Sequence, residues 1–339
     1  MEENKTFIVP PNLAFCEHKY EIQSEIGEGT FSKVFRARCK TTGAIVAIKA
    51  ITRTSSPVRI HEELSILKVL NGNNNCIKLL DVMRSQDQIL AVFPFFLSTD
   101  FKEFILKCTI QDVKKYLYYL IKAVSHMHNN NLIHRDLKPA NFLFDLESQT
   151  GYLIDFGLAQ FEKSQENLQP ENPSKPVIFF SATVTPSKPP GYYENDSRPA
   201  MKAPRAGTRG FRAPEVLFKY ANQSKAIDMW SIGVIMLCIF TTQYPFFLSL
   251  EDVDGLAELG IVFGHSEMRK VAKHYGRVWK SNLNTIKEEG LSFDQIIKTY
   301  NPNLELEASA IDLLKELLDP IDITRIEAQE ALKHPFFDN

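Results

Sequence analysis

Cysteine is scarce in this sequence and is never clustered. The chain has five cysteines in 339 residues, an odd number, and no two of them form a C-x-x-C pair. Disulfide-stabilised secreted domains and structural zinc sites both need paired or closely spaced cysteines. We therefore expect reduced, buried thiols in a protein of the cytosol or nucleus.

Long apolar runs and an excess of one charge are also missing. The longest apolar run, residues 229–240, is interrupted by Ser231 and Gly233, whereas a membrane-spanning helix needs about 20 apolar residues. The first thirty residues show no basic start followed by an apolar stretch, so no signal peptide is expected. Lysine plus arginine number 39 and aspartate plus glutamate 41. This balance argues against a protein that coats nucleic acid or anionic lipid, and composition indicates no activity.

The residues that are present fall into two parts. From about Tyr20 to residue 97, short β-branched and aromatic runs alternate with polar turns and predict strands at about 32–38, 45–51, 77–83 and 89–95. One stretch with helical spacing in this part predicts a helix at 57–70. Residues 1–19 remain as an N-terminal extension.

From residue 98 to residue 339 the pattern is helical. An amphipathic helix is expected at 109–128, and a helix that is apolar nearly all round is expected at 225–241. Thr324 and Glu327 have the spacing of a capping box, which predicts the start of the last helix. The sequence therefore predicts a small strand-rich lobe followed by a larger helical lobe.

Residues 161–204 fit neither lobe. They hold eight of the eighteen prolines, a density that excludes a long helix or a central strand. An irregular stretch of this length is usually a functional insertion or a disordered linker, and both alternatives stay open. The apolar patch 177–180 makes a short docked piece possible.

A glycine-containing turn lies near the start of the strand-rich lobe. It comprises Ile26, Gly27, Glu28, Gly29, Thr30, Phe31, Ser32, Lys33 and Val34. Two glycines at this spacing let backbone amides fold closely over a polyphosphate. No G-K-[ST] follows, so the turn is not a P-loop. Ser32 stands where the usual G-x-G-x-x-G has its third glycine, so, taken alone, the turn is better explained as a plain glycine hairpin.

Lys49 ends an apolar strand that reads Val-Ala-Ile-Lys. A lysine in such a place is unusual unless its ammonium has a fixed anionic partner. Glu63, in the helix predicted at 57–70, can supply that partner. The alternative is a lysine that reaches solvent along its alkyl stem and a solvated glutamate.

One motif decides between these alternatives. Residues 134–141 read His-Arg-Asp-Leu-Lys-Pro-Ala-Asn, and Asp-Phe-Gly follows at 155–157. This ordered pair resembles the catalytic signature of the eukaryotic protein kinase family. The resemblance extends to Ala-Pro-Glu at 213–215, Asp-Met-Trp-Ser-Ile-Gly at 228–233, Arg325 and His-Pro-Phe-Phe at 334–337. It implies an α+β, bilobal kinase fold, with an antiparallel sheet and one main helix in the N-lobe (20–97) and a mainly helical C-lobe (98–339).

The resemblance assigns roles that fit the chemistry, because phosphoryl transfer depends on positioning and charge neutralisation. Lys49, held by Glu63, would grip the α- and β-phosphates of ATP. Asn141 and Asp155 would bind Mg²⁺, which prefers hard oxygen ligands.

The catalytic residues follow from the same motif. Asp136 would orient the substrate hydroxyl and accept its proton. Lys138 would place a cation near the transferred phosphoryl group. In the family, a lysine at this position marks serine/threonine kinases.

The adenine pocket is also implied by the resemblance. Phe93 aligns with the gatekeeper. Pro94 would use its carbonyl and Phe96 its N–H to bind adenine, so the proline loses no group that the site needs. The apolar walls would be Ile26, Val34, Ala47 and Leu143.

Several details narrow the family. The string Gly-Thr-Arg-Gly-Phe-Arg-Ala-Pro-Glu at 207–215, the Gly-Glu-Gly-Thr-Phe-Ser turn and the long insertion resemble the cell-division-cycle-seven kinases. This resemblance implies a nuclear kinase that is activated by a Dbf-type regulatory subunit and acts on the minichromosome-maintenance (MCM) helicase to fire replication origins. It implies acidic or already phosphorylated target sites, and neither direct nucleic-acid binding nor membrane association is expected. No basic nuclear-localisation cluster is visible.

Two other classes remain as alternatives. A pseudokinase scaffold would be expected to lack one of Lys49, Asp136, Asn141 and Asp155, and all four are present. Another acidophilic kinase, similar to the casein kinases, is argued against by the insertion and by the 207–215 string.

Substrate recognition is predicted for one basic cluster. Arg205, Arg209 and Arg212, with Thr208, lie where the residue after the phosphoacceptor should bind, and arginine pairs bidentately with carboxylate or phosphate. The alternative for Arg212 is a structural ion pair within the protein.

Overall fold

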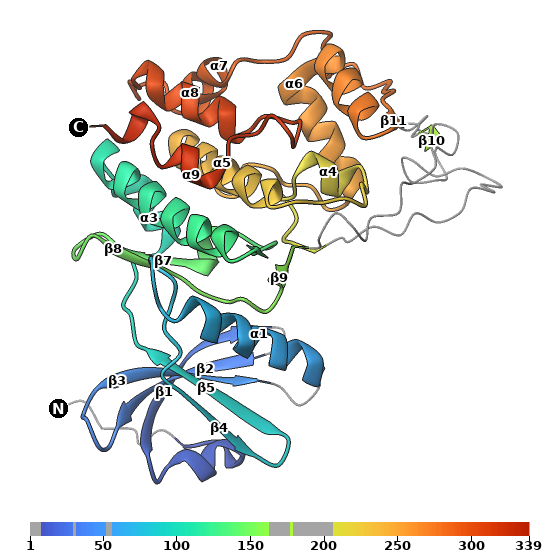
Figure 1. Ribbon diagram of the computed structural model, residues 1–339. Coiled ribbons are helices and arrows are strands. Elements are labelled where there is room, and N and C mark those ends of the chain that lie inside the picture. Colours follow the sequence, from blue (N-terminus) through green and yellow to red (C-terminus); the bar gives the residue numbers. More distant parts are fainter. Residues whose placement is uncertain (1–7, 30–31, 52–55, 163–176, 179–205, 339) are drawn as a thin grey trace.

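The chain folds into two lobes, as Figure 1 shows. The computed structural model describes residues 8–29, 32–51, 56–162, 177–178 and 206–338. A five-stranded antiparallel sheet and one long helix form the N-lobe, and helices form most of the C-lobe. The α+β, bilobal architecture expected from the sequence is confirmed.

The N-lobe sheet has the strand order β1-β2-β3-β5-β4. Its strands are β1 (Tyr20–Gly29), β2 (Ser32–Cys39), β3 (Ile45–Ile51), β4 (Asp81–Ser85) and β5 (Gln88–Pro94). The strand predicted at 77–83 begins later, because the backbone N–H of Ile77 donates to the Leu153 carbonyl of the C-lobe. Leu80 donates to Val92 of β5 directly before β4 begins.

One face of the sheet carries a small core that includes part of the N-terminal extension. The short 3-10 helix η1 (Pro11–Cys16) buries Leu13 and Cys16 against the sheet residues Phe35 and Ile48. Burying such apolar side chains stabilises the lobe by an amount proportional to the area removed from water. The described part of the extension therefore packs as part of the N-lobe.

The N-lobe helix α1 (Pro57–Leu70) has the predicted bounds and is buried over only part of its length. Its buried residues, Ile66, Leu67 and Leu70, all lie in its C-terminal half. Asn71 ends it in a left-handed conformation, with φ of 49°, which asparagine tolerates better than most residues. In Figure 1, α1 lies between the sheet and the C-lobe.

Two helices form the centre of the C-lobe. In α3 (Ile110–Asn129), Thr109 and Asp112 form a complete capping box, and an apolar stripe faces the core. In α5 (Ala226–Thr241), every residue from Ile227 to Thr241 is buried. Both helices agree with their predicted ranges to within about a residue, since each pattern is local and long.

The remaining C-lobe elements surround this centre. They are α2 (Phe101–Lys107), β6 (Leu132–Ile133), η2 (Pro139–Asn141), β7 (Phe142–Asp145), β8 (Thr150–Leu153), β9 (Gln160–Phe161), α4 (Pro214–Leu217), α6 (Asp252–His274), β11 (Arg277–Val278), α7 (Phe293–Tyr300), α8 (Ala308–Leu317), α9 (Ala328–Ala331) and η4 (Pro335–Phe337). The capping box predicted at Thr324 is wrong. The Thr324 hydroxyl donates to the Ile321 carbonyl, and α9 begins only after Glu327.

Part of the insertion is described. Strand β10 (Val177–Ile178) pairs in parallel with β11, Val177 opposite Arg277. The docked piece that the apolar patch suggested therefore forms at 177–178, and the rest of 163–205 lies outside the described residues. A search of the described helices finds none that is long and apolar enough to cross a membrane.

Candidate active site

Lys49 lies at the centre of an ion-pair network between the lobes. It sits in β3, and its Nζ is 2.7 Å from Glu63 Oε1 and 2.9 Å from Asp155 Oδ1. Glu63 comes from α1, and Asp155 follows β8 in the C-lobe. One ammonium thus connects the N-lobe sheet, α1 and the start of the activation segment. The pairing predicted for Lys49 and Glu63 is present.

Burial and charge act in opposite directions on this network. Burial alone would lower the pKa of Lys49, but the carboxylates of Glu63 and Asp155 outweigh it, and the net shift is upward. Burial would raise the pKa of Asp155, and the Lys49 ammonium outweighs that effect and lowers it. Both groups therefore stay charged at neutral pH, as the roles predicted for them require.

Three residues bond to Asp136: Lys138 and Asn141 from the same loop, and Thr208 from farther along the chain. Lys138 Nζ is 2.9 Å from Asp136 Oδ2. The backbone N–H and hydroxyl of Thr208 donate to Asp136 Oδ1 at 2.6 and 2.7 Å, and Lys138 Nζ also donates to Thr208 Oγ1. Asn141 donates to the backbone carbonyl of Asp136 at 2.8 Å. These bonds fix the position of the carboxylate, and its predicted role in accepting the substrate proton stays a prediction.

Asp228 holds the backbone at the start of this loop. Its carboxylate accepts the backbone N–H groups of His134 and Arg135, both at 2.8 Å, and it lies 3.0 Å from His128 Nε2. Burial would raise the pKa of Asp228, but its bonds to His128 and to the backbone lower it. Arg135 has a φ of 70°, a conformation that needs support from its surroundings. Two backbone bonds to a buried carboxylate supply that support.

Asn141 and Asp155 have oxygen atoms that can ligate a hard cation. The Asn141 amide nitrogen donates to the Asp136 carbonyl, so the amide oxygen remains to bind a cation. Asp155 uses Oδ1 for Lys49, and its side chain is 47% exposed. These are oxygen donors of the kind that Mg²⁺ binds while it keeps several waters. No cluster of three or more His, Cys, Asp or Glu suited to a metal occurs among the described residues.

The glycine turn forms the end of the β1–β2 hairpin. Gly27 pairs with Val34, Glu28 with Lys33, and Gly29 with Ser32. Lys33 Nζ lies 3.3 Å from Glu28 Oε1. Thr30 and Phe31, at the tip, lie outside the described residues. The contacts of the turn with nucleotide stay a prediction.

Three of the four predicted adenine walls are half-buried. These are Val34, Ala47 and Leu143, and each has a buried neighbour in its strand. The fourth, Ile26, is 46% exposed beside a β-bulge. Strand neighbours point to opposite faces, so Val34 and Ala47 face away from the N-lobe core. Phe93 pairs with Ala47 across β3 and β5, and its gatekeeper role stays a prediction.

The hinge proline causes no loss of sheet hydrogen bonds to β3. Pro94 pairs with Val46, next to the hydrogen-bonded pair of Phe95 and Ile45. Bonded and non-bonded pairs alternate in antiparallel sheets, so Pro94 occupies a position that needs no N–H. Within the described part of the chain, no protein group accepts the Phe96 N–H. That donor is available to a ligand.

The predicted substrate cluster separates into residues with different roles. Arg212 donates to Asp252 Oδ1 at 2.7 Å and to the Gly207 carbonyl at 2.9 Å. The geometry favours the structural alternative for Arg212, because its guanidinium already has these partners. Thr208 belongs to the catalytic loop network. Arg209 is exposed, no described carboxylate lies within ion-pair distance of it, and Arg205 lies outside the described residues.

Sequence reasoning missed one residue that contacts the site. Arg59 Nη2 donates to the Gly157 carbonyl at 3.1 Å, so α1 binds the Asp-Phe-Gly segment directly. Arg59 lies four residues before Glu63, and this spacing puts both on one face of the helix. That spacing was the available signal.

Comparison with known proteins agrees with this geometry. The family model of the protein kinase domain matches residues 20–337. Probable cell division control protein 7 homolog 1 of Encephalitozoon cuniculi is 52% identical over 97% of this chain and 94% of that protein. Cell cycle serine/threonine-protein kinase hsk1 of Schizosaccharomyces pombe is 35% identical over 94% of this chain and 73% of that protein. The cell division cycle 7-related protein kinase of Homo sapiens is 25% identical over 94% of this chain and 89% of that protein.

Proposed function

Because the chain belongs to the protein kinase family, and within it to the group of cell division control protein 7 homologs, we propose that this serine/threonine kinase phosphorylates the MCM helicase and so triggers origin firing. The observation that carries the proposal is the coincidence of whole-length similarity to these relatives with an assembled site. Lys49, Glu63 and Asp155 are paired, and Asp136 is bonded to Lys138. A scaffold without catalysis has no need for this arrangement.

The proposed chemistry follows from the network around Asp136. The substrate hydroxyl oxygen attacks the γ-phosphorus of ATP, its proton passes to Asp136, and the bond from the γ-phosphorus to the ADP oxygen breaks. Lys138 stabilises the charge on the transferred phosphoryl group, and Lys49 holds the α- and β-phosphates. Asn141 and Asp155 would hold Mg²⁺, which neutralises charge on the phosphate oxygens.

We place the preference for acidic or phosphorylated sites on Arg209. It is exposed and one residue from Thr208, which bonds Asp136. An arginine in this place can pair with a carboxylate or phosphate on the residue after the phosphoacceptor. Arg205 is proposed to act with it.

We propose that a Dbf-type subunit activates the kinase and that the complex acts in the nucleus. The first half of α1 is exposed and carries Val58, which is 64% exposed. A partner that docks there would stabilise the position of Glu63, on which the Lys49 pair depends. A partner can act on this helix because burial holds only its second half.

Phosphorylation assays with matched substrates test the function. The purified chain, with and without the Dbf-type subunit, is given MCM subunits and peptides that differ only in Ser-Asp, Ser-phosphoSer or Ser-Asn. We expect faster transfer to the first two, dependence on the subunit, and loss of the preference in Arg209→Ala. Asp136→Asn is the control for contaminating kinases.

Each outcome bears on a separate part of the proposal. Equal rates for the Ser-Asp and Ser-Asn peptides would exclude the acidic preference. Full activity of the chain alone would exclude the activating subunit. Efficient transfer to acidic peptides with no transfer to MCM subunits would overturn the proposed substrate.

A further inference from the structure

Arg135 lies next to Asp136 in the catalytic loop, and its side chain has an uncharged partner. Its Nη1 donates to Gln160 Oε1 at 2.9 Å. Asp228 accepts the backbone N–H of Arg135 and not its guanidinium. Among the described residues, no carboxylate lies within ion-pair distance of this guanidinium. A half-buried cation beside the catalytic aspartate is thus held by a neutral amide.

Burial makes this partner important. It lowers the pKa of Arg135, and the charge of Asp228 opposes that effect without cancelling it. A guanidinium nevertheless keeps its charge at neutral pH, so its removal from water is costly unless its N–H groups find acceptors. Hydrogen bonds to charged groups are among the stronger ones in proteins. The Gln160 oxygen therefore helps to fix where the Arg135 side chain lies.

The chain enters the insertion through β9, which is fixed to the strand before the catalytic loop. Gln160 pairs with Ile133 across β9 and β6. The Glu162 N–H donates to the Asn131 carbonyl at 2.7 Å. The side-chain bond from Arg135 adds a third contact, and this contact reaches the catalytic loop itself.

The residues that follow the insertion contact Arg135 as well. Gly207 has a φ of 102°, and a Cβ atom added there would lie 2.7 Å from the Arg135 carbonyl oxygen, so the two backbones are in close contact. Thr208, the next residue, bonds to Asp136. Arg135 therefore touches both flanks of the insertion, with its side chain on one and its backbone on the other.

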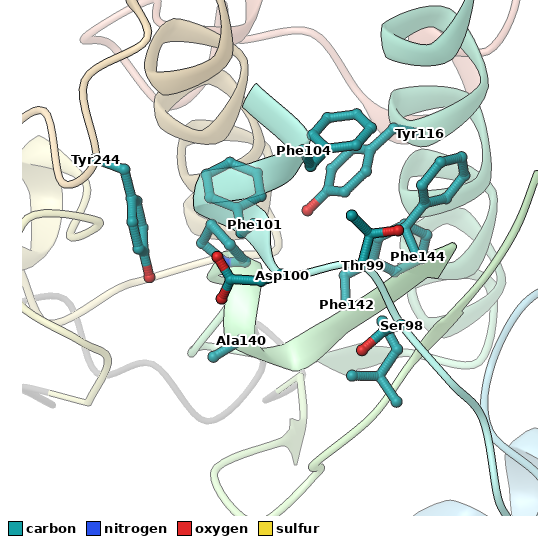
Figure 2. Close-up of a pocket in the computed structure, with 12 residues that line it drawn as sticks. Ser98, Thr99, Asp100, Phe101, Phe104, Tyr116, Ala140, Phe142, Phe144 and Tyr244 are labelled. Carbon is teal, nitrogen blue, oxygen red and sulfur yellow. The ribbon is translucent and has the colours of Figure 1, made fainter. Parts of the chain in front are cut away.

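Gln160 lines neither of the two pockets found beside the catalytic loop. One pocket is lined in part by Pro139 and Ala140 and is shown in Figure 2. The other is lined in part by Arg135 and Leu137. Since Gln160 is absent from both linings, a change at this residue acts on the loop through Arg135 and not through a pocket that a substrate side chain could fill.

We propose that Gln160 is a positioning residue for phosphoryl transfer, whose side-chain oxygen holds Arg135 so that both flanks of the insertion lie against the catalytic loop. A carboxylate or a phosphate would pair with arginine more strongly, but a phosphate is present only after modification of the chain. The Gln160 amide is present as soon as the chain folds. The arrangement therefore needs no phosphorylation of this kinase.

Two substitutions separate the acceptor oxygen from the size of the side chain. Gln160→Met keeps the length and removes the acceptor, whereas Gln160→Glu keeps an acceptor and adds a charge. We expect kcat to fall about tenfold in Gln160→Met and less than about threefold in Gln160→Glu, because only the first loses a bond to a charged group. KM for ATP should stay within about twofold in both, since the residues predicted to bind ATP are unchanged.

Two further variants serve as controls. Phe161→Ala should keep the wild-type kcat, because Phe161 follows Gln160 in β9 and is 53% exposed. In an Arg135→Ala background, Gln160→Met should have no further effect on kcat, because the partner through which Gln160 acts is already removed. A further loss of about tenfold in that background would show that Gln160 acts elsewhere and would overturn the proposal.

The assay uses casein as substrate and the purified chain, alone and with the Dbf-type subunit. The kinase is first treated with a protein phosphatase, which is then removed. We expect the wild type to keep its rate and to transfer phosphate linearly from the first time point. A lag, or a rate that recovers only after incubation with ATP, would show that phosphorylation is required and would overturn the proposal.

Hydrogen exchange gives a readout that does not depend on activity. The Glu162 amide, which bonds to Asn131 beside the β6–β9 pair, should exchange about tenfold faster in Gln160→Met. In Gln160→Glu and Phe161→Ala it should exchange as in the wild type.

The outcomes separate this proposal from the proposed function. A loss of kcat in Gln160→Met that Gln160→Glu restores supports the role of the oxygen. Equal losses in these two variants, wild-type kcat in Gln160→Met, or faster exchange without a loss of kcat would overturn it. Because the substrate is casein, a result against the MCM helicase as target leaves each of these outcomes unchanged.

Discussion

Two ion pairs in this kinase have similar distances and opposite surroundings. Arg325 and Glu215 lie 2.7 Å apart in the C-lobe, both side chains fully buried. Lys49 and Glu63 are also 2.7 Å apart, but both are partly exposed in the cleft. Arg325 also donates to the carbonyls of Asp319 and Ala226 and stacks over a tryptophan ring. The first pair is closed off from solvent, with four Arg325 hydrogen bonds to protein acceptors, whereas the second leaves its ammonium partly exposed.

The helices next to these pairs differ in the same way: Arg325 donates to Ala226 of α5, and Glu63 belongs to α1. In α5, fifteen consecutive residues are buried, whereas α1 buries three, all in its second half. The C-lobe is held by packing and α1 by a few polar contacts. A mutation in the first region should therefore unfold the protein, and a mutation in the second should change activity while the fold persists.

The largest effect is expected for Arg325→Ala. Removing the guanidinium leaves the Glu215 carboxylate buried without a partner, and breaking a buried pair in this way costs about 3–5 kcal/mol. Chemical denaturation should show this loss in the free energy of unfolding. Arg325→Lys, which keeps one charge, should lose less. A change under about 1 kcal/mol for Arg325→Ala would contradict the structural role of this pair.

Lys49→Met should lower activity much more than stability. We expect kcat/KM to fall at least about a hundredfold, a loss of about 2.7 kcal/mol in the transition state. The free energy of unfolding should fall less than in Arg325→Ala, because Asp155 is 47% exposed to water and Glu63, at 12%, is not fully buried. Glu63→Gln, which keeps the lysine, is the milder variant. If Lys49→Met failed to fold, the Lys49–Glu63 pair would be needed for stability, as the Arg325–Glu215 pair is, and the proposed difference between them would be wrong.

Arg59→Ala tests whether α1 depends on its polar contacts. The Arg59 bond to Gly157 and the Glu63 bond to Lys49 are contacts that hold the exposed half of the helix. Without Arg59, we expect kcat to fall about five- to tenfold, or about 1–1.4 kcal/mol, at unchanged stability. Lys68→Ala, at an exposed position of the same helix, is the control. Equal kinetics for both variants would show that Arg59 does not position α1.

Local patterns were sufficient for the regular elements. The bounds of β3 and α1 agree with their predictions, because the alternation of 45–51 and the helical spacing of 57–70 depend on neighbouring residues. The chemical roles were predicted from ordered motifs, and the predicted pair of Lys49 and Glu63 is present. The ion pair between Asp136 and Lys138 was not predicted.

What the sequence could not predict depends on partners far along the chain. Strand β4 starts late because Ile77 bonds to Leu153. Arg212 contacts Asp252, forty residues away. The Thr324–Glu327 spacing fits a capping box, but the Thr324 hydroxyl bonds to Ile321 instead. A single sequence contains no signal that chooses between such distant contacts and the local alternative.

Acid should affect the C-lobe through Asp228. Its folded pKa is lowered, so its stabilisation is present above the unfolded value of about 3.9 and is lost as the pH falls through the folded value. We expect the free energy of unfolding to decrease below about pH 4. In Asp228→Asn this part of the decrease should be absent, although the variant is less stable at neutral pH. If the free energy of unfolding falls with pH equally in both proteins, Asp228 does not contribute to the acid dependence of stability.

The smallest effect is expected when a threonine that caps a helix is compared with one that does not. Thr109 accepts the Asp112 N–H, and Asp112 accepts the Thr109 N–H, so the cap of α3 is complete. Thr109→Ala should cost about 1 kcal/mol. Thr324→Ala removes a threonine with the same sequence spacing but no capping bond, and it should cost less than about 0.5 kcal/mol. Denaturation of the two variants under identical conditions measures the difference, and equal losses would mean that the capping bond contributes nothing to the stability of α3.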